Sequence, residues 1–113
     1  SDTDWLIPAN PAYFDVLGAF RKKKTLCWHP RKKMVEGDTV YIYYAAPYSC
    51  LICRCMVTGF CPDGGTKITL QEFYDRGRYP LADLKAHGSN TVRFVTRLPL
   101  ELKAYLEGTD SEQ

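Results

Sequence analysis

The best defined extended pattern of the chain lies between residues 39 and 46, where aliphatic and tyrosine side chains follow one another. Extended structure there puts two apolar sets on opposite faces: Val40, Ile42 and Tyr44 on one, Tyr41, Tyr43 and Ala45 on the other. Glu36-Gly37-Asp38 is a turn signal before this strand, and Pro47 breaks it. Residues 50–60 and 66–74 resume extended patterns on either side of a turn at residues 62–65. The pattern therefore predicts three consecutive antiparallel strands, with the tyrosines in the wall of the sheet.

The N-terminal third predicts a strand, a helix and a second strand. Residues 5–7 form a short apolar strand, and Asn10 followed by Pro11 is typical of an N-cap and a first helical position. We expect a helix from Pro11 whose apolar stripe is Tyr13 or Phe14, then Leu17 and Phe20. Residues 25–28 are the second strand.

Two short helices are expected near the C-terminus. Pro80 can start one that ends at Gly88, and Pro99 can start another over residues 100–106 that ends at Gly108. Residues 91–95 look extended between them, and the polar tail 109–113 is expected to fray. The order of elements predicts an α+β fold: a strongly curved, mostly antiparallel sheet that partly closes into a barrel, with short peripheral helices.

Length and composition favour one domain, over residues 1–108. A chain of 113 residues with 45% hydrophobic and 25% charged residues builds a single modest core. It has no apolar run of about 18 residues, so we expect a cytoplasmic protein without membrane contact. It begins at Ser1 rather than Met, so the native polypeptide could extend beyond either end.

The five cysteines do not match the spacing of a metal-binding motif. Cys53 and Cys55 share one face of a predicted strand and Cys50 the other, whereas a zinc knuckle needs paired cysteines on a tight turn. Cys27, His29 and Cys61 could in principle complete a site. Small apolar strand residues with reduced thiols are the favoured interpretation, with no metal and no cofactor.

Charge and one aromatic residue indicate the chemistry. The formal net charge is only +2, yet residues 21–33 hold seven Lys or Arg and no acidic residue. Trp28 lies within this stretch at the end of a predicted strand, and an aromatic surface in a positive field suits an unstacked base attached to phosphate. A core tryptophan flanked by solvated lysines is an equal alternative. The predicted phosphate contacts are Arg21, Lys22, Lys23, Lys24, Arg31, Lys32 and Lys33, extended by Arg93 and Arg97, although a solvated flank explains the last two as well.

Several segments together resemble the EVE domain of the PUA-like superfamily. They are residues 5–11 (Trp-Leu-Ile-Pro-Ala-Asn-Pro), Cys27-Trp28, residues 35–43, residues 46–49, and the C-terminal stretches 81–88 and 92–106. This chain has Pro8-Ala9-Asn10-Pro11 where many family members carry a Lys-Ser-Glu-Pro type sequence.

The resemblance implies a cavity that accepts a modified, methylated or hydroxymethylated base turned out of DNA or RNA, as in the similar YTH-type readers. It implies no catalysis by the module itself, and a role in bacterial modification-dependent defence with a nuclease or other effector, fused or in trans. By position, Trp28 matches the cage tryptophan, His29 the polar residue after it, and Asn10 the asparagine near the end of the first strand. Pro47, Tyr48 and Ser49 are the expected opposite wall.

Other interpretations stay open at this point. Asn10 as a simple N-cap competes with a base-reading role, and Trp5 is expected in the core. An RNA-binding PUA-like module in RNA modification or processing is the first alternative function. A peptide-binding module is another, as is an enzyme with Cys27 or Cys61 as nucleophile and His29 or His87 as base.

Overall fold

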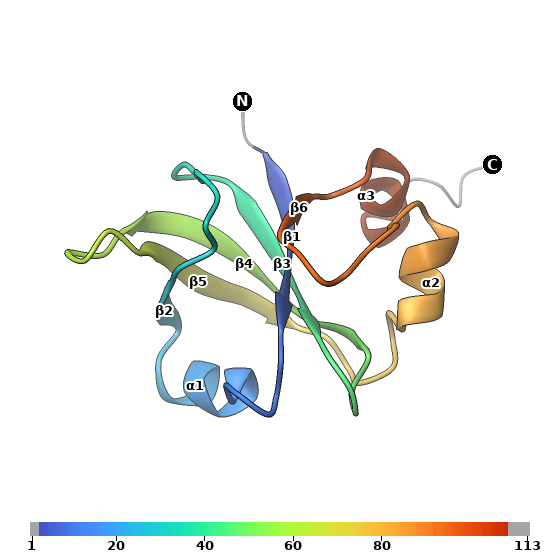
Figure 1. Ribbon diagram of the computed structural model, residues 1–113, viewed down its shortest axis with the longest axis horizontal. Helices are drawn as coiled ribbons and strands as arrows, with labels where there is room; N and C mark the ends of the chain where they lie inside the picture. Colours follow the sequence, from blue (N-terminus) through green and yellow to red (C-terminus); the bar gives the residue numbers. More distant parts are fainter. Residues whose placement is uncertain (1–2, 109–113) are drawn as a thin grey trace.

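The computed structural model describes residues 3–108, which form one six-stranded sheet and three short helices. The sheet has the order β2-β5-β4-β3-β1-β6 and does not close, since β2 and β6 are its two edges (Figure 1). The strands are β1 (Asp4–Ala9), β2 (Thr25–Trp28), β3 (Thr39–Tyr44), β4 (Cys50–Phe60), β5 (Thr66–Phe73) and β6 (Thr96–Arg97). The helices are α1 (Val16–Lys22), α2 (Leu81–Ala86) and α3 (Leu100–Leu106). This architecture confirms the predicted α+β class.

The predicted antiparallel meander is confirmed as β3, β4 and β5, which are neighbours in the sheet. β1 joins it by pairing parallel with β3, because the chain crosses over through α1 and β2 between these two strands. β2 returns to the far edge, where it pairs antiparallel with β5 and places Trp28 opposite Thr66. Trp28 therefore stands at the last pair of an edge strand.

The alternation along β3 divides two apolar clusters, one on each face of the sheet. Val40, Ile42 and Tyr44 belong to the cluster that contains α1 residues Val16 and Phe20. Tyr41, Tyr43 and Ala45 lie in the other cluster, with Leu84 of α2 and Leu102 of α3. Figure 1 shows the corresponding arrangement, with α1 beside β2 and with α2 and α3 together near β6. Both faces of the central strands are thus covered, as the sequence predicts for the tyrosines.

The first helix begins later than predicted. It starts at Val16 rather than Pro11, and its N-cap is Asp15, whose carboxylate accepts a hydrogen bond from the Gly18 N–H at 2.9 Å. Residues 10–14 form a turn instead, because the carbonyl of Asn10 accepts from the N–H groups of Tyr13 and Phe14. The predicted N-cap at Asn10 is therefore wrong, and Tyr13 and Phe14 are released from the expected core stripe.

The C-terminal helices agree with the prediction, while the strand before α3 does not. Pro80 and Pro99 precede α2 and α3, and Gly88 has a left-handed φ of 100° just after α2. Residues 91–95 bend rather than extend, and the only strand between the helices in the described range is β6. No described helix is long and apolar enough to cross a membrane. The tail 109–113 lies outside the described residues.

Asp38 ties the start of the chain to the turn before β3. Its side chain is 1% exposed and accepts hydrogen bonds from the Trp5 indole Nε1, the Thr3 N–H and the Val35 N–H, at 2.9, 2.9 and 3.0 Å. Burial by itself raises the pKa of Asp38, but these three donors outweigh it and hold the pKa below its ordinary value. Trp5 is 7% exposed and lies in the core as expected.

Candidate nucleic-acid-binding pocket

A pocket of about 310 Å³ opens beside Trp28, where the ends of β1 and β2 meet the turn before α1. Its lining residues are Ala9, Asn10, Tyr13, Phe14, Cys27, Trp28 and His29. Trp28 is half-buried: it packs on the core cluster and also borders the pocket. The ring of Phe14 meets it edge to face, with centroids 5.5 Å apart and planes at 82°. The volume is at the lower end of the range for small-molecule sites.

The Tyr44 hydroxyl holds the aromatic turn in place. It donates to the Phe14 carbonyl at 2.9 Å and accepts from the Val16 N–H at 3.2 Å, so one buried hydroxyl joins the turn, the first residue of α1 and β3. Burial raises the pKa of Tyr44, which keeps the hydroxyl protonated. The position of Phe14 against Trp28 therefore depends on a tyrosine in the centre of the sheet.

Replacing Tyr44 with phenylalanine is expected to lower the free energy of unfolding by about 1–2 kcal/mol, because the buried Val16 N–H and Phe14 carbonyl each lose a partner. Chemical denaturation measures the change. Tyr13→Phe is the control, since Tyr13 is 87% exposed, and it should leave stability unaltered. Equal stability of Tyr44→Phe and Tyr13→Phe would show that the hydroxyl does not anchor the turn.

Asn10 lies on the pocket wall, with its side-chain oxygen turned into the loop. Oδ1 accepts from the Ala12 N–H at 2.9 Å, an Asx turn that fits the Asn10-Pro11 sequence. The Nδ2 group has no hydrogen-bond partner among residues 3–108. The amide can thus offer a donor to a ligand, and it serves the turn rather than a helix cap.

The structure does not place Pro47, Tyr48 or Ser49 on this pocket. Tyr48 stacks on Tyr44 at 4.7 Å, and the guanidinium of Arg76 covers its ring at 4.5 Å. Tyr13 and Phe14 line the pocket instead, and Phe14 is in ring contact with Trp28. The sequence prediction missed this pair because it placed both residues in a helix that begins at Pro11. The sequence feature that could have indicated their position is Asn10-Pro11, which is typical of an Asx turn.

Basic residues border two further hollows, of which the first shares lining residues with the pocket and the second shares lining residues with the first. One, lined by Asn10, Tyr43 and Arg93 among others, meets the pocket at Asn10. The next contains Arg93 together with Arg31, Lys32 and the exposed Phe94. Arg31, Lys32 and Arg93 are exposed, and none forms a salt bridge with a residue in the range 3–108. They form what we call the basic track.

The other predicted phosphate contacts are more dispersed. Arg21, Lys22, Lys23 and Lys24 are exposed around the end of α1, and Lys23 borders a separate hollow that includes Cys27 and Lys67. Lys33 is exposed beyond Lys32. Arg97 belongs to β6, with its guanidinium 5.9 Å from the centre of the Trp5 ring. These residues therefore do not line a single hollow: Arg97 lies in β6, and the others lie before and after β2.

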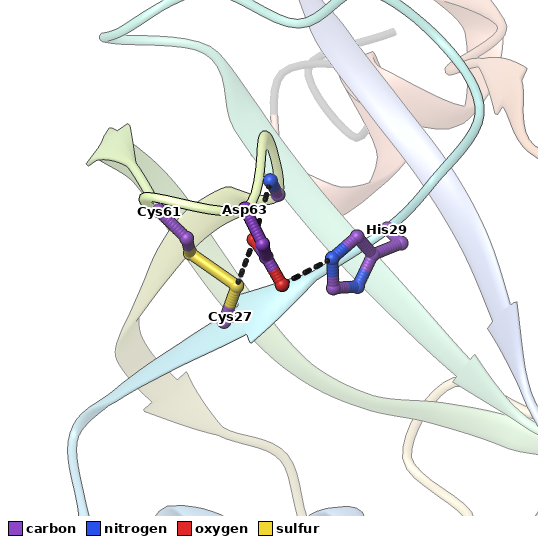
Figure 2. The surroundings of a disulfide bond; sticks show 5 residues. Cys27, His29, Cys61 and Asp63 are labelled. Carbon is purple, nitrogen blue, oxygen red and sulfur yellow. Dashed lines mark hydrogen bonds and ion pairs between the residues drawn. A yellow bond between two sulfur atoms is a disulfide. The ribbon is translucent and has the colours of Figure 1, made fainter.

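The cysteine prediction is wrong at two positions, because Cys27 and Cys61 are joined by a disulfide (Figure 2). Both lie near the exposed turn at residues 61–65, and their Cα atoms are 6.3 Å apart. In this state neither offers the thiol nucleophile that a Cys/His enzyme needs. The remaining three, Cys50, Cys53 and Cys55, are free and buried, as small apolar strand residues should be.

Asp63 joins this group from the turn between β4 and β5. One carboxylate oxygen accepts from the Gly65 N–H at 2.9 Å, and the other lies 3.1 Å from His29 Nε2. The Gly65 N–H, followed by the His29 imidazole, lowers the pKa of Asp63. Since Nε2 of His29 faces Asp63, its Nδ1 is the nitrogen left for a ligand in the pocket. Asp63 escaped sequence reasoning because Asp-Gly-Gly is also an ordinary turn signal.

Comparison with known proteins gives matches in structure alone: no family model and no curated protein matches the chain. A hypothetical protein from Leishmania major superposes with a TM-score of 0.72 at 16% identity, covering 100% of this chain and 97% of that one. ASCH from Zymomonas mobilis superposes with a TM-score of 0.62 at 12% identity, covering 93% of this chain and 94% of that one. The fold is PUA-like.

A solved structure of a Rhodopseudomonas palustris protein agrees, with a TM-score of 0.67 at 14% identity over 98% of this chain and 95% of that one. Identities this low show the fold and nothing finer. The comparisons therefore agree with the PUA-like fold that the sequence resemblance implies. Membership of the EVE family stays a prediction.

Proposed function

We propose that this chain is a nucleic-acid-binding PUA-like module, without catalytic activity of its own, that takes one unstacked base into the pocket beside Trp28. The observation that carries the proposal is a succession of shared lining residues. The pocket shares Ala9 and Asn10 with the neighbouring hollow, and that hollow shares Arg93 with the one that contains Arg31 and Lys32. A base in the pocket leaves its flanking phosphates beside the exposed cations. The PUA-like fold supports RNA as the first candidate ligand.

The expected energies suit this division of roles. Removing a base from its stack costs a few kcal/mol, and stacking on an aromatic ring returns about 1–3 kcal/mol. Phosphate contacts from Arg31, Lys32 and Arg93 add sequence-independent affinity that falls steeply with salt. Asn10 Nδ2 and His29 Nδ1 then supply the polar contacts to the edge of the base. Affinity would come from the track and base preference from the pocket.

A methylated base is the finer proposal for the ligand. Ala9, Phe14 and Trp28 provide apolar surface in the pocket, and one buried methyl group contributes about 0.8 kcal/mol, or about fourfold in affinity. Preference of this size requires no added polar contact. The nuclease or other effector and the defence role expected from the resemblance find no support in the fold or the comparisons.

The test is a titration of short single-stranded RNA and DNA, methylated and plain, with Trp fluorescence as the signal. Log affinity should fall with log salt at a slope of about −0.7 for each phosphate contact. Arg93→Glu should weaken binding to every sequence alike and reduce the magnitude of this slope by about 0.7, the share of one phosphate contact. The matched control is Lys85→Glu on α2, which changes net charge equally outside the track.

Two results would contradict the proposal. Binding that does not depend on salt would exclude phosphate contacts along the track and would favour a peptide ligand. Equal losses in Arg93→Glu and Lys85→Glu would show that only net charge matters. Equal affinity for methylated and plain oligonucleotides would reject the finer proposal and leave the coarser one standing.

A further inference from the structure

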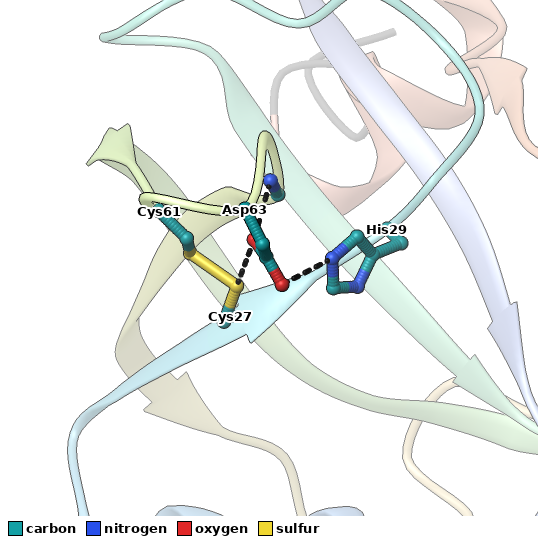
Figure 3. A network of polar contacts seen from close by, with 5 residues as sticks. Cys27, His29, Cys61 and Asp63 are labelled. Atoms are coloured by element: carbon teal, nitrogen blue, oxygen red, sulfur yellow. Dashed lines mark hydrogen bonds and ion pairs between the residues drawn. A yellow bond between two sulfur atoms is a disulfide. The ribbon is translucent and has the colours of Figure 1, made fainter.

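Four side chains with metal-binding atoms converge next to the pocket, and the proposed function uses none of them as a metal site. Cys27 and His29 come from the end of β2 and the residue after it, two positions apart. Cys61 and Asp63 come from the turn that joins β4 to β5, again two positions apart. Figure 3 shows the Asp63 carboxylate between the sulfur of Cys27 and the ring of His29.

The distances are those of neighbouring ligands around one ion. Bond lengths of about 2.0–2.3 Å to a tetrahedral zinc ion put its ligand atoms about 3.2–3.8 Å from one another. Asp63 Oδ1 lies 3.7 Å from Cys27 Sγ, and Asp63 Oδ2 lies 3.1 Å from His29 Nε2. The ligand atoms of Cys27, Cys61 and Asp63 all lie within 4.8 Å of one another, and His29 is outside this group of three and reaches it through its contact with Asp63.

Gly65 shows that the donor atoms converge on one point. A Cβ atom at this position would lie 2.6 Å from Cys27 Sγ, 2.8 Å from His29 Nε2 and 3.1 Å from Asp63 Oδ1. The φ of Gly65 is outside the left-handed region, in contrast to Gly64 at +91°, so its backbone conformation does not require glycine. Space for the three donors requires it.

We propose that, in the reduced protein, Cys27, His29, Cys61 and Asp63 bind one zinc ion. Two thiolates with one imidazole and one carboxylate form a donor set that zinc accepts in tetrahedral geometry. The ion connects the end of the edge strand β2 to the turn between β4 and β5. It thereby fixes the two residues that flank Trp28, which are its neighbours on the pocket wall.

Reduction of the disulfide precedes zinc binding. Two molecules of a low-molecular-weight thiol break the Cys27–Cys61 bond, each cysteine gains one electron and one proton, and the two thiols become one disulfide. Zinc then displaces both cysteine protons into solvent, while Asp63 binds as a carboxylate and His29 through neutral Nε2. Oxidation and zinc occupancy therefore exclude each other at this site.

The experiment treats the whole chain with a phosphine reductant, adds zinc, removes unbound metal and measures zinc by mass spectrometry. We expect about one zinc per chain and a rise in the Tm on zinc addition. Cobalt in place of zinc should give thiolate charge-transfer absorption and the intense visible bands of tetrahedral coordination. The same chain left oxidised should bind no zinc.

Two variants replace proposed ligands, and a third is the control. Cys61→Ser and Asp63→Asn should each weaken zinc binding more than about 10-fold, and Asp63→Asn keeps the oxygen that accepts from Gly65. Asp75→Asn, an exposed aspartate after β5, is the control and should bind zinc like the wild type. Reduced wild type without bound zinc, or zinc binding unaltered in Cys61→Ser and Asp63→Asn, would overturn the proposal. Neither result bears on binding of nucleic acid to the basic track.

Discussion

Asp38→Ala is expected to lower the free energy of unfolding by about 3–5 kcal/mol, the largest effect of any substitution considered for this chain. The carboxylate is 1% exposed and is the acceptor for the Trp5 indole and for the N–H groups of Thr3 and Val35. Alanine leaves three donors without this acceptor, of which the Trp5 indole is in a buried bond and the other two are part-buried, and it opens a cavity beside the Trp5 ring. Urea denaturation followed by fluorescence measures the loss.

Two further variants separate charge from hydrogen bonding. Asp38→Asn keeps one acceptor oxygen but turns an NH₂ group toward N–H donors, so its stability should lie between those of the wild type and Asp38→Ala. Asp75→Ala removes an exposed carboxylate and should change stability little. If Asp38→Ala and Asp75→Ala unfold at the same urea concentration, the buried carboxylate does not hold the N-terminal strand to the sheet.

The same carboxylate makes stability depend on pH. The folded pKa of Asp38 is lower than its unfolded value of about 3.9, so its contribution is fully present above that value. It is lost as the pH falls through the folded pKa, because the unfolded chain then binds the extra proton first. Repeating the urea series from neutral to acidic pH should show a smaller decline for Asp38→Asn than for the wild type.

Period-two alternation carried most of the fold prediction. From Val40 to Tyr44 of β3, successive residues belong in turn to the two core clusters, so the order of side chains alone separates the face under α1 from the face under α2 and α3. Prolines at 80 and 99 likewise predicted where helices begin, since proline suits the start of a helix. Pro11 gave the same signal and no helix started there. The reason is that Asn10 Oδ1 accepts a hydrogen bond from the Ala12 N–H, which forms a turn in place of a helix cap.

Some residues of the candidate site could be predicted from their neighbours in sequence, whereas others are positioned by contacts with distant residues. Trp28 and the basic residues could be predicted because an aromatic and its neighbouring charges are adjacent in sequence. Phe14 and Asp63 could not, because their positions depend on contacts with residues 30 and 34 positions away: the Phe14 carbonyl with Tyr44, and the Asp63 carboxylate with His29. No local sequence pattern predicts contacts between residues so far apart in the chain. The pairing of Cys27 with Cys61 is of this kind as well, since it requires β2 to return to the far edge beside β5.

Trp28→Leu is expected to weaken binding of single-stranded nucleic acid by about 5- to 150-fold, the equivalent of the 1–3 kcal/mol that a base gains by stacking on an aromatic ring. Leucine retains apolar bulk against the core cluster but has no π face for the base, so the loss reports stacking rather than packing. Trp28→Phe should retain much of the affinity. The preference for a methylated base should vanish in Trp28→Leu, because the methyl group is then no longer held against a flat surface.

The salt dependence of the same variants decides what Trp28 contributes. Because the basic track is intact in Trp28→Leu, its slope of log affinity against log salt should equal that of the wild type, whereas Arg93→Glu changes the slope. A Trp28 that served only as core would give a different pattern: Trp28→Leu would lower stability and leave affinity as it was. Three measurements on one set of variants therefore separate three roles. A loss of affinity at unaltered slope identifies a stacking surface, a change in slope identifies a phosphate contact, and a loss of unfolding free energy at unaltered affinity identifies a structural residue.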